Sequence, residues 1–255
     1  MNPAKVTLVG AGPGDADLLT LKAVKAIQAA TLLLVDDLVG DDVVALAAPG
    51  TRVIHVGKRG GCKSTPQAFI EKLMVMAARE GENVVRLKGG DPLIFGRGGE
   101  EVEHLRSEGV AVEVINGITA GLAAANALGV ALTHREHAHG VLFITGHARS
   151  GSEGPHWRAL AAAARDARLT LVIYMGVGGA ERIQQELLSA LPASMPVAVV
   201  QRASLPGERQ CVTTLGDLHG AIVREQLASP AVIVVGDVVS GIAAAAAAAA
   251  QARTA

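Results

Sequence analysis

The sequence predicts an α/β protein built from two lobes, with a mostly parallel sheet in the N-terminal lobe and a mixed sheet in the C-terminal lobe. Short runs rich in β-branched residues alternate with stretches of helical periodicity, which favours parallel strands joined by helices. In the second half, two strand-like runs flank the turn Leu205-Pro206-Gly207, and this arrangement indicates an antiparallel hairpin. The chain has 255 residues, of which 50% are hydrophobic, which suits one large domain or two compact lobes.

The N-terminal half is expected to follow this alternation closely. Strands are expected at residues 6–9, 32–35, 53–56, 83–87 and 112–115. A helix with Asp17 as its cap is expected from residue 18 to about residue 29, because apolar residues recur there at helical spacing. Two further helices are expected at residues 66–79 and 98–107.

The C-terminal half also alternates strands and helices, but it includes the expected antiparallel hairpin. Helices are expected at residues 119–128 and 181–191, and strands at residues 141–145, 170–174, 197–201, 210–214 and 231–235. We place the division at Asn116-Gly117, so that the N-terminal lobe is residues 1–116 and the C-terminal lobe is residues 117–241. Residues 242–255 are expected to form a frayed or disordered alanine-rich tail.

Charge and composition exclude several classes of protein. The formal net charge is −1 and aromatic residues make up 2% of the chain, so neither a basic field nor a base-stacking platform predicts binding to nucleic acid or to a membrane surface. The longest apolar run, residues 242–250, is too short to span a bilayer. Two distant cysteines, Cys62 and Cys211, form no metal or disulfide pattern. With no signal-peptide pattern at the N-terminus, the expected location is the reducing cytoplasm.

The first expected strand ends in the glycine-rich loop Gly10-Ala11-Gly12-Pro13-Gly14-Asp15. Open α/β sheets bind ligands beyond the carboxyl ends of their strands, so this loop is a candidate ligand site. It departs from the dinucleotide pattern G-x-G-x-x-G, because Asp15 replaces the third glycine and Pro13 removes a backbone N–H. The loop therefore suits a neutral or cationic ligand better than a diphosphate. On this loop alone, an NAD(P)-dependent oxidoreductase remains an alternative.

A longer segment, residues 86–101, interleaves glycines and a proline with acidic and basic side chains. An ordinary turn followed by a helix would account for Glu100 and Glu101, which the helix dipole favours in a first turn. Such a turn would not need so many glycines or so long a segment. We therefore interpret residues 86–101 as part of a binding site.

These two loops and several other segments resemble the uroporphyrinogen-III C-methyltransferases of the tetrapyrrole methylase family. The resemblance covers about residues 5–240, and residues 86–101 with Thr133-His134-Arg135 are more specific to this branch than the first loop is. It implies two α/β lobes with the cofactor in the cleft between them, usually in a homodimer, and a tetrapyrrole substrate. The other matching segments are Val56-Gly57-Lys58-Arg59, Gly117-Ile118-Thr119-Ala120, Thr145-Gly146-His147 and Ile173-Tyr174-Met175-Gly176.

The reaction implied by this resemblance is methylation of uroporphyrinogen III by S-adenosyl-L-methionine. Two methyl transfers would give precorrin-2 and leave S-adenosyl-L-homocysteine. Ala203 stands where the family has a glycine, and a backbone contact to the cofactor would survive that change. Asp91 and backbone carbonyls are expected to face the cationic sulfonium and amino group. The other implied cofactor-binding residues are Pro13, Gly89, Gly90, Ile94, Thr119, Ala120 and Met175.

The resemblance also assigns acid–base roles to Asp36 and Lys58. Asp37 follows Asp36 where many relatives carry Arg, so a solvated strand end is the alternative interpretation of these two carboxylates. General base catalysis by Asp36 would collect the proton that the substrate releases after methylation.

Substrate contacts are expected from basic side chains, because arginine matches the carboxylates on the rim of the substrate with paired hydrogen bonds. Glu100 lies one helical turn from Arg97 and is expected to orient Arg97, which is also a catalytic candidate, or to act as a base. For each basic residue the alternative is a surface cation. The candidates are Arg59, Lys63, Arg97 and Arg135.

No metal is expected, because His134, His137 and His139 surround a turn without fixed ligand spacing. The residues argue against three alternatives to the implied function. A different tetrapyrrole methylase should lack the segment 86–101, and an oxidoreductase should show the full G-x-G-x-x-G pattern. A non-catalytic binding module would not need charged residues at successive strand ends.

Overall fold

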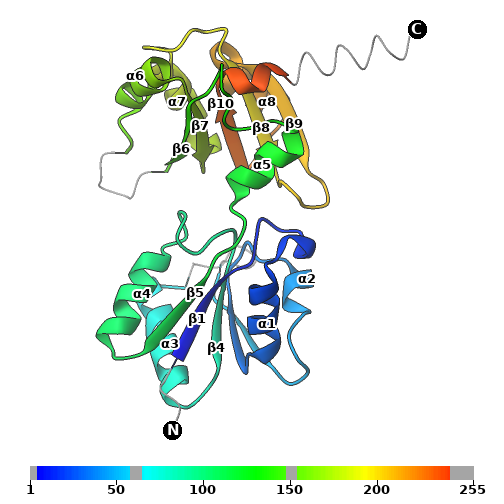
Figure 1. Cartoon of the computed structure of the whole chain (residues 1–255), viewed down its shortest axis with the longest axis vertical. Helices are drawn as coiled ribbons and strands as arrows, with labels where there is room; N and C mark the ends of the chain where they lie inside the picture. The colour runs from blue at the N-terminus through cyan, green and yellow to red at the C-terminus, as the bar shows by residue number, and fades with distance from the viewer. Residues whose placement is uncertain (1–4, 58–64, 148–153, 242–255) are drawn as a thin grey trace, which may run out of the picture. The chain divides into compact units, whose positions relative to one another are not determined.

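The computed structural model describes residues 5–57, 65–147 and 154–241. The chain divides into two compact units, Met1–Ala120 and Gly121–Ala255, each built around its own sheet (Figure 1). The first unit ends a few residues beyond the expected division at Asn116-Gly117. The alanine-rich tail, residues 242–255, lies outside the described residues.

The sheet of the first unit has the strand order β3-β2-β4-β1-β5, and all its pairings are parallel. Strands that are covered on both faces need no polar alternation, which explains the nearly continuous hydrophobic runs. The expected mostly parallel sheet is therefore confirmed. The strands are β1 (Lys5–Gly10), β2 (Leu32–Val35), β3 (Arg52–His55), β4 (Val84–Lys88) and β5 (Ala111–Ile115).

Helices cover both faces of this sheet. On one face, α1 (Leu21–Ala29) and α2 (Asp41–Val44) pack through Ala23, Ile27 and Val43 against alternate strand residues. On the other face, α3 (Gln67–Arg79) and α4 (Gly98–Ser107) pack on the intervening strand residues. Because side chains alternate along a strand, the even-numbered residues of β4 point toward α3 and α4.

The start of α1 differs from the expectation. The helix begins at Leu21, and the Thr20 hydroxyl caps it by accepting a hydrogen bond from Ala23 N at 3.1 Å. Asp17 is therefore wrong as its cap. A separate 3-10 turn, Ala16–Leu18, precedes the helix, and Asp15 caps this turn by accepting from Asp17 N. Two polar caps follow one another here, Asp15 for the 3-10 turn and Thr20 for the α-helix.

The second unit has a mixed sheet with the order β6-β7-β10-β8-β9. β6 and β7 are parallel, β10 is antiparallel to both β7 and β8, and β8 and β9 form the expected hairpin. The expected mixed sheet is confirmed. The strands are β6 (Gly140–Thr145), β7 (Leu169–Tyr174), β8 (Pro196–Gln201), β9 (Arg209–Thr214) and β10 (Ala231–Val235).

The helices of this part of the chain are α5 (Ala120–Leu128), α6 (Trp157–Ala167), α7 (Ala180–Leu187) and α8 (Leu218–Arg224). α6 and α8 are not expected from the sequence pattern, and α7 ends at Leu187 instead of residue 191. The buried Trp157, Ala161 and Ala164 form the face of α6 that packs into the core, and this tertiary packing stabilises the helix. Among the described residues, no helix combines the length and apolarity that crossing a membrane requires.

Candidate functional site

The carboxyl ends of the parallel strands of the first unit meet at one edge of its sheet. This edge is the usual ligand-binding edge of an open α/β sheet. Most of the expected site residues of this unit lie in the loops that leave it. Lys58, Arg59 and Lys63 lie outside the described residues. The residues that the edge brings together are Pro13, Asp36, Gly89, Gly90, Asp91, Ile94, Thr119 and Ala120.

Three glycines let the loops at this edge pack backbone against backbone. A Cβ atom on Gly117 would lie 2.2 Å from Gly90 O, and one on Gly10 would lie 2.4 Å from Gly117 N. Gly12 and Gly90 also form a bridge through two backbone hydrogen bonds, of 3.2 Å and 2.6 Å. The loops after β1, β4 and β5 are thereby fixed to one another. A ligand at this edge would meet main-chain atoms at close range.

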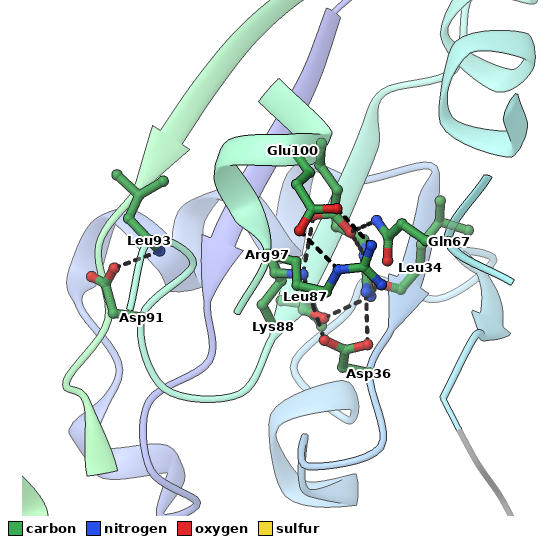
Figure 2. Close-up of polar contacts among 11 residues, drawn as sticks. Leu34, Asp36, Gln67, Leu87, Lys88, Asp91, Leu93, Arg97 and Glu100 are labelled. Atoms are coloured by element: carbon green, nitrogen blue, oxygen red, sulfur yellow. Dashed lines mark hydrogen bonds and ion pairs between the residues drawn. The ribbon is translucent and has the colours of Figure 1, made fainter. Parts of the chain in front are cut away.

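Asp91 ties two of these loops together. Its side chain is buried; Oδ1 accepts a hydrogen bond from Leu93 N at 2.8 Å (Figure 2), and Oδ2 accepts from Asn116 Nδ2 at 3.1 Å and Gly117 N at 3.2 Å. The sequence alone suggests that this carboxylate faces a bound cation. In the structure Oδ1 accepts from a backbone N–H, and Oδ2 accepts from a backbone N–H and a side-chain amide. Asp91 therefore links the loops after β4 and β5. Direct contact with a cofactor stays a prediction.

Arg97 stands at the start of α4 in a left-handed conformation, with φ of +57°, and Phe95 nearby has φ of +52°. Such conformations are strained for side chains larger than glycine and concentrate at functional sites. Arg97 donates hydrogen bonds from Nε and NH2 to the two carboxylate oxygens of Glu100. The hydrogen bond to Glu100 raises the pKa of Arg97 above its ordinary value. The expectation that Glu100 orients Arg97 matches this geometry.

Buried charged side chains lie next to Asp36, and Figure 2 shows one of them, Lys88, near its carboxylate. Arg86 and Lys88, on β4, are both buried, and so is Glu101 on α4. Arg86 NH2 contacts Asp36 Oδ1 at 2.6 Å, and Arg86 Nε contacts Glu101 Oε1 at 3.2 Å. Lys88 Nζ lies 3.1 Å from Glu101 Oε2. Asp36 is therefore not simply a solvated strand end, since two buried cations face it.

Sequence reasoning missed Arg86, Lys88 and Glu101 as site residues. A signal was present, because two basic residues two positions apart interrupt an otherwise apolar strand, and such residues are almost never fully buried unless paired. Gln67 at the start of α3 was also missed, and its Nε2 donates to Glu101 Oε1 at 3.1 Å. Pairing between residues far apart in the chain could not be inferred from spacing.

In the second unit, Met175 and Ala203 follow β7 and β8, which run in the same direction because both are antiparallel to β10. Both residues therefore lie at one edge of the second sheet. Met175 has φ of +54°, and Ala203 lies between two residues of positive φ, Arg202 and Ser204. This concentration of strained backbone marks the edge as a candidate binding surface.

Arg135 lies elsewhere in the second unit. It belongs to the turn closed by the bridge between His134 and Ala138, just before β6 begins. β6 and β7 are parallel, so Arg135 lies at the edge opposite to Met175. Within this unit, the structure does not bring Arg135 together with the other candidates.

The same turn gathers three possible metal ligands. One ligand atom each from His134, Glu136 and His137 lies within 4.8 Å of the others, and all three residues are exposed. The His134 Nδ1 atom already accepts a hydrogen bond from Glu136 N at 3.1 Å, which a metal at that atom would displace. His139 is not part of the group. The expectation of no metal stays a prediction.

Comparisons with known proteins agree with the expected family. Residues 5–219 match the model of the Tetrapyrrole (Corrin/Porphyrin) Methylases. A protein of Pseudomonas aeruginosa named uroporphyrinogen-III C-methyltransferase is 49% identical over 239 residues, which are 93% of this chain and 95% of that protein. An Arabidopsis thaliana protein, named S-adenosyl-L-methionine-dependent uroporphyrinogen III methyltransferase, chloroplastic, is 48% identical over 238 residues, 93% of this chain and 64% of its own length.

Solved structures give the same answer. The crystal structure of uroporphyrin-III C-methyltransferase from Thermus thermophilus, complexed with S-adenyl homocysteine, superposes with a TM-score of 0.78. It is 42% identical and covers 92% of this chain and 99% of its own. The chain therefore belongs to the tetrapyrrole (corrin/porphyrin) methylase family, as its loops and strand ends predicted.

Proposed function

We propose that this protein is an S-adenosyl-L-methionine-dependent methyltransferase that transfers two methyl groups to uroporphyrinogen III, giving precorrin-2. The observation that carries the proposal is the 49% identity to a protein named for this reaction, over 93% of this chain and 95% of that protein. The Thermus thermophilus structure bound to the demethylated cofactor supports the choice of methyl donor.

The residues at the edge of the first sheet fit this methyl donor. The donor supplies an electrophilic methyl group on a positively charged sulfur. Pro13 offers no N–H to a diphosphate, and the buried carboxylate of Asp91 places negative charge under the glycine loops, which favours a cation. The residues proposed to hold the donor are Pro13, Gly89, Gly90, Asp91, Ile94, Thr119, Ala120, Met175 and Ala203.

The substrate carries acetate and propionate groups, and Arg97 is the described residue best suited to bind one of them. Its guanidinium already holds a carboxylate, that of Glu100, through two donors, and an exposed pair of this kind is weak enough to exchange. Arg59 and Lys63 remain proposed contacts, and so does Arg135 in spite of its position at the opposite edge of the second sheet.

Asp36 is proposed as the proton acceptor, with Lys58 as its acid–base partner. The Asp36 side chain is 31% exposed, so its carboxylate is accessible to a substrate while Arg86 fixes one of its oxygens. The enzyme would mainly align the reacting carbon with the methyl group, and the base would collect the proton afterwards. A homodimer in the cytoplasm is proposed on the resemblance to the family alone.

Calorimetric titration separates this proposal from the oxidoreductase alternative. S-adenosyl-L-homocysteine should bind the purified protein, and excess NAD⁺ should not change its affinity. Tight binding of NAD⁺ without binding of S-adenosyl-L-homocysteine would favour the oxidoreductase and contradict the proposal.

A further inference from the structure

Two cations and one carboxylate are buried behind Asp36 on the side of the sheet that α3 and α4 cover. The exposed fractions of the side chains are 2% for Arg86, 3% for Lys88 and 0% for Glu101. Asp36, at 31%, is the only one of the four with substantial access to solvent. With Asp36 ionised, the four charges balance.

A buried ion pair is not usually retained for stability alone, because apolar residues of similar size often stabilise a core as well or better. β4 is the central strand of the first sheet, where an apolar pair would be the simpler choice. In this cluster both cations lie between the buried Glu101 and Asp36, the residue with access to a ligand. This arrangement therefore points to a role in the chemistry of that carboxylate.

The two oxygens of Asp36 are held differently. Oδ1 receives a hydrogen bond from Arg86 NH2 at 2.6 Å. Oδ2 lies 3.7 Å from Lys88 Nζ, which is beyond hydrogen-bonding distance. Arg86 is fixed in turn by Leu34 O and Leu87 O, each at 3.2 Å from its NH1. Among the residues that the structure describes, no hydrogen bond reaches Oδ2, which is therefore the oxygen assigned to take the proton.

Lys88 lies between two carboxylates. Its Nζ is 3.1 Å from Glu101 Oε2 and 3.7 Å from Asp36 Oδ2. Glu101 Oε2 is buried, and among the described residues no hydrogen bond of ordinary geometry reaches it. The interaction between Lys88 and Glu101 Oε2 is therefore an ion pair without a hydrogen bond. A small movement of the ammonium would give Glu101 Oε2 the hydrogen bond it lacks.

We propose that Glu101 and Lys88 are positioning residues that limit the buildup of buried positive charge while Asp36 accepts the proton, an inference that rests on the proposed function. Protonation of Asp36 leaves the two cations with one carboxylate, and Glu101 holds this excess to a single positive charge. In this step a C–H bond of the methylated tetrapyrrole breaks and its electron pair stays in the ring system. The proton forms an O–H bond at Asp36 Oδ2. Lys88 then shifts further toward Glu101, with which it is already paired, and the proton later leaves the partly exposed Asp36 for water.

The substitution Glu101→Gln tests the proposal, because it keeps the shape of the side chain and removes its charge. We expect kcat for uroporphyrinogen III to fall by about tenfold or more, while KM and the affinity for S-adenosyl-L-homocysteine change by less than about threefold. Glu103→Gln, an exposed position on the same helix, is the matched control and should keep full kcat. Full kcat in Glu101→Gln would overturn the proposal.

Removing one charge from a buried cluster can prevent folding, so a second variant is needed. Lys88→Met with Glu101→Gln removes one cation and one anion and leaves the Arg86–Asp36 pair. This double variant should fold because its net charge is kept, and it should still lose kcat by about tenfold or more, because the ammonium group that faces Asp36 Oδ2 is gone. A folded double variant with the wild-type kcat would contradict the proposal.

Introducing Glu101→Gln into a protein that already carries Asp36→Asn distinguishes a positioning role of Glu101 from a role in stabilising the fold. Asp36→Asn alone should lower kcat by about 10²–10⁴-fold. Adding Glu101→Gln to Asp36→Asn should then cost little more, because the acceptor that Glu101 serves is already gone. Losses that multiply would show that Glu101 supports only the fold. Wild-type protein that does not methylate uroporphyrinogen III would refute the proposed function itself, whereas active wild type with fully active variants would refute only this inference.

Discussion

Arg97 and Glu100 form a bidentate ion pair across the first turn of α4. Arg97 Nε lies 3.0 Å from Glu100 Oε1, and Arg97 NH2 lies 2.6 Å from Glu100 Oε2. Both side chains are 56% exposed, so the pair contributes only ~0.2–0.5 kcal/mol to the helix. Glu100 therefore holds the guanidinium in an orientation that suits a carboxylate. Exchanging Glu100 for another carboxylate would cost little free energy, because the existing pair is weak.

Arg97→Ala should lose activity without losing the cofactor. If Arg97 binds a carboxylate of the tetrapyrrole, the loss of a charged hydrogen bond of about 1.5–3 kcal/mol lowers kcat/KM by roughly tenfold or more. Arg97→Lys should also be impaired, because an ammonium group cannot make the paired contact. Steady-state kinetics and calorimetry with S-adenosyl-L-homocysteine measure both effects. Near-wild-type turnover in both variants would remove Arg97 from the site.

Glu100→Gln is the companion to these variants. If Glu100 only orients Arg97, turnover should stay within about threefold of wild type, since a surface pair of a few tenths of a kcal/mol is lost. A fall of about 10²–10⁴-fold would instead identify Glu100 as a general base and would displace Asp36 from that role.

Gly117→Ala should destabilise the first unit and weaken the binding of S-adenosyl-L-homocysteine. The added Cβ would lie 2.2 Å from Gly90 O, which forces the loops after β4 and β5 apart at a cost of about 1–3 kcal/mol. Gly99→Ala is the control, because a Cβ there meets nothing within 4 Å and alanine favours a helix. Urea unfolding and calorimetry check both variants. Equal stability of the two would contradict the close packing described here.

Asp91→Asn should disorder the same loops by a different route. The carboxylate accepts three hydrogen bonds, from Leu93 N, Asn116 Nδ2 and Gly117 N, and an amide would turn a donor toward at least one of them. Leaving such buried groups unpaired costs about 1–3 kcal/mol. We expect lower stability together with weaker binding of S-adenosyl-L-homocysteine. Weaker binding at unchanged stability would indicate direct contact with the cofactor instead.

Glu113 should give the protein a pH-dependent contribution to stability. Hydrogen bonds from Lys22, which has the larger effect, and from Lys5 lower the pKa of Glu113 from 4.5 to about 2. A carboxyl group whose pKa is lowered by folding stabilises the protein above its unfolded pKa, and this stabilisation is lost as the pH falls through the folded pKa. Glu113→Gln should therefore lower the free energy of unfolding at pH 7.

The difference between Glu113→Gln and wild type should shrink as the pH falls from about 4.5 toward about 2. Glu103→Gln, on the exposed side of α4, should track the wild type throughout. Chemical unfolding across this range measures the effect. A difference that stays constant with pH would show that the two lysines do not shift the pKa of Glu113.

The alternation of strand and helix was enough to predict the fold class, because most of the strands are short and apolar. It was not enough to find α6 and α8. The apolar face of α6 consists mostly of alanines, and the burial of its Trp157 depends on packing between residues far apart in the chain. The cap of α1 was misplaced because Asp15, Asp17 and Thr20 all offer capping oxygens within a few residues.

The sequence was sufficient to predict the loop residues of the candidate site. It was not sufficient to predict the ion pairs between side chains on different elements. The glycines at residues 10, 90 and 117 were visible as loop residues, and the structure adds that they touch one another. Lys88 and Glu101 were overlooked because their contact joins a strand to a distant helix turn. Arg135 was grouped with the other candidates by its motif. Because β6 and β7 are parallel, Arg135 before β6 and Met175 after β7 lie at opposite edges of their sheet.

The most direct test of the account is an anaerobic incubation of the purified protein with uroporphyrinogen III and S-adenosyl-L-methionine carrying a labelled methyl group. Mass spectrometry of the tetrapyrrole at exhaustive conversion should show two labelled methyl groups per molecule, with two equivalents of S-adenosyl-L-homocysteine formed. An unlabelled tetrapyrrole, or a single dominant product with one methyl group, would contradict the proposed function.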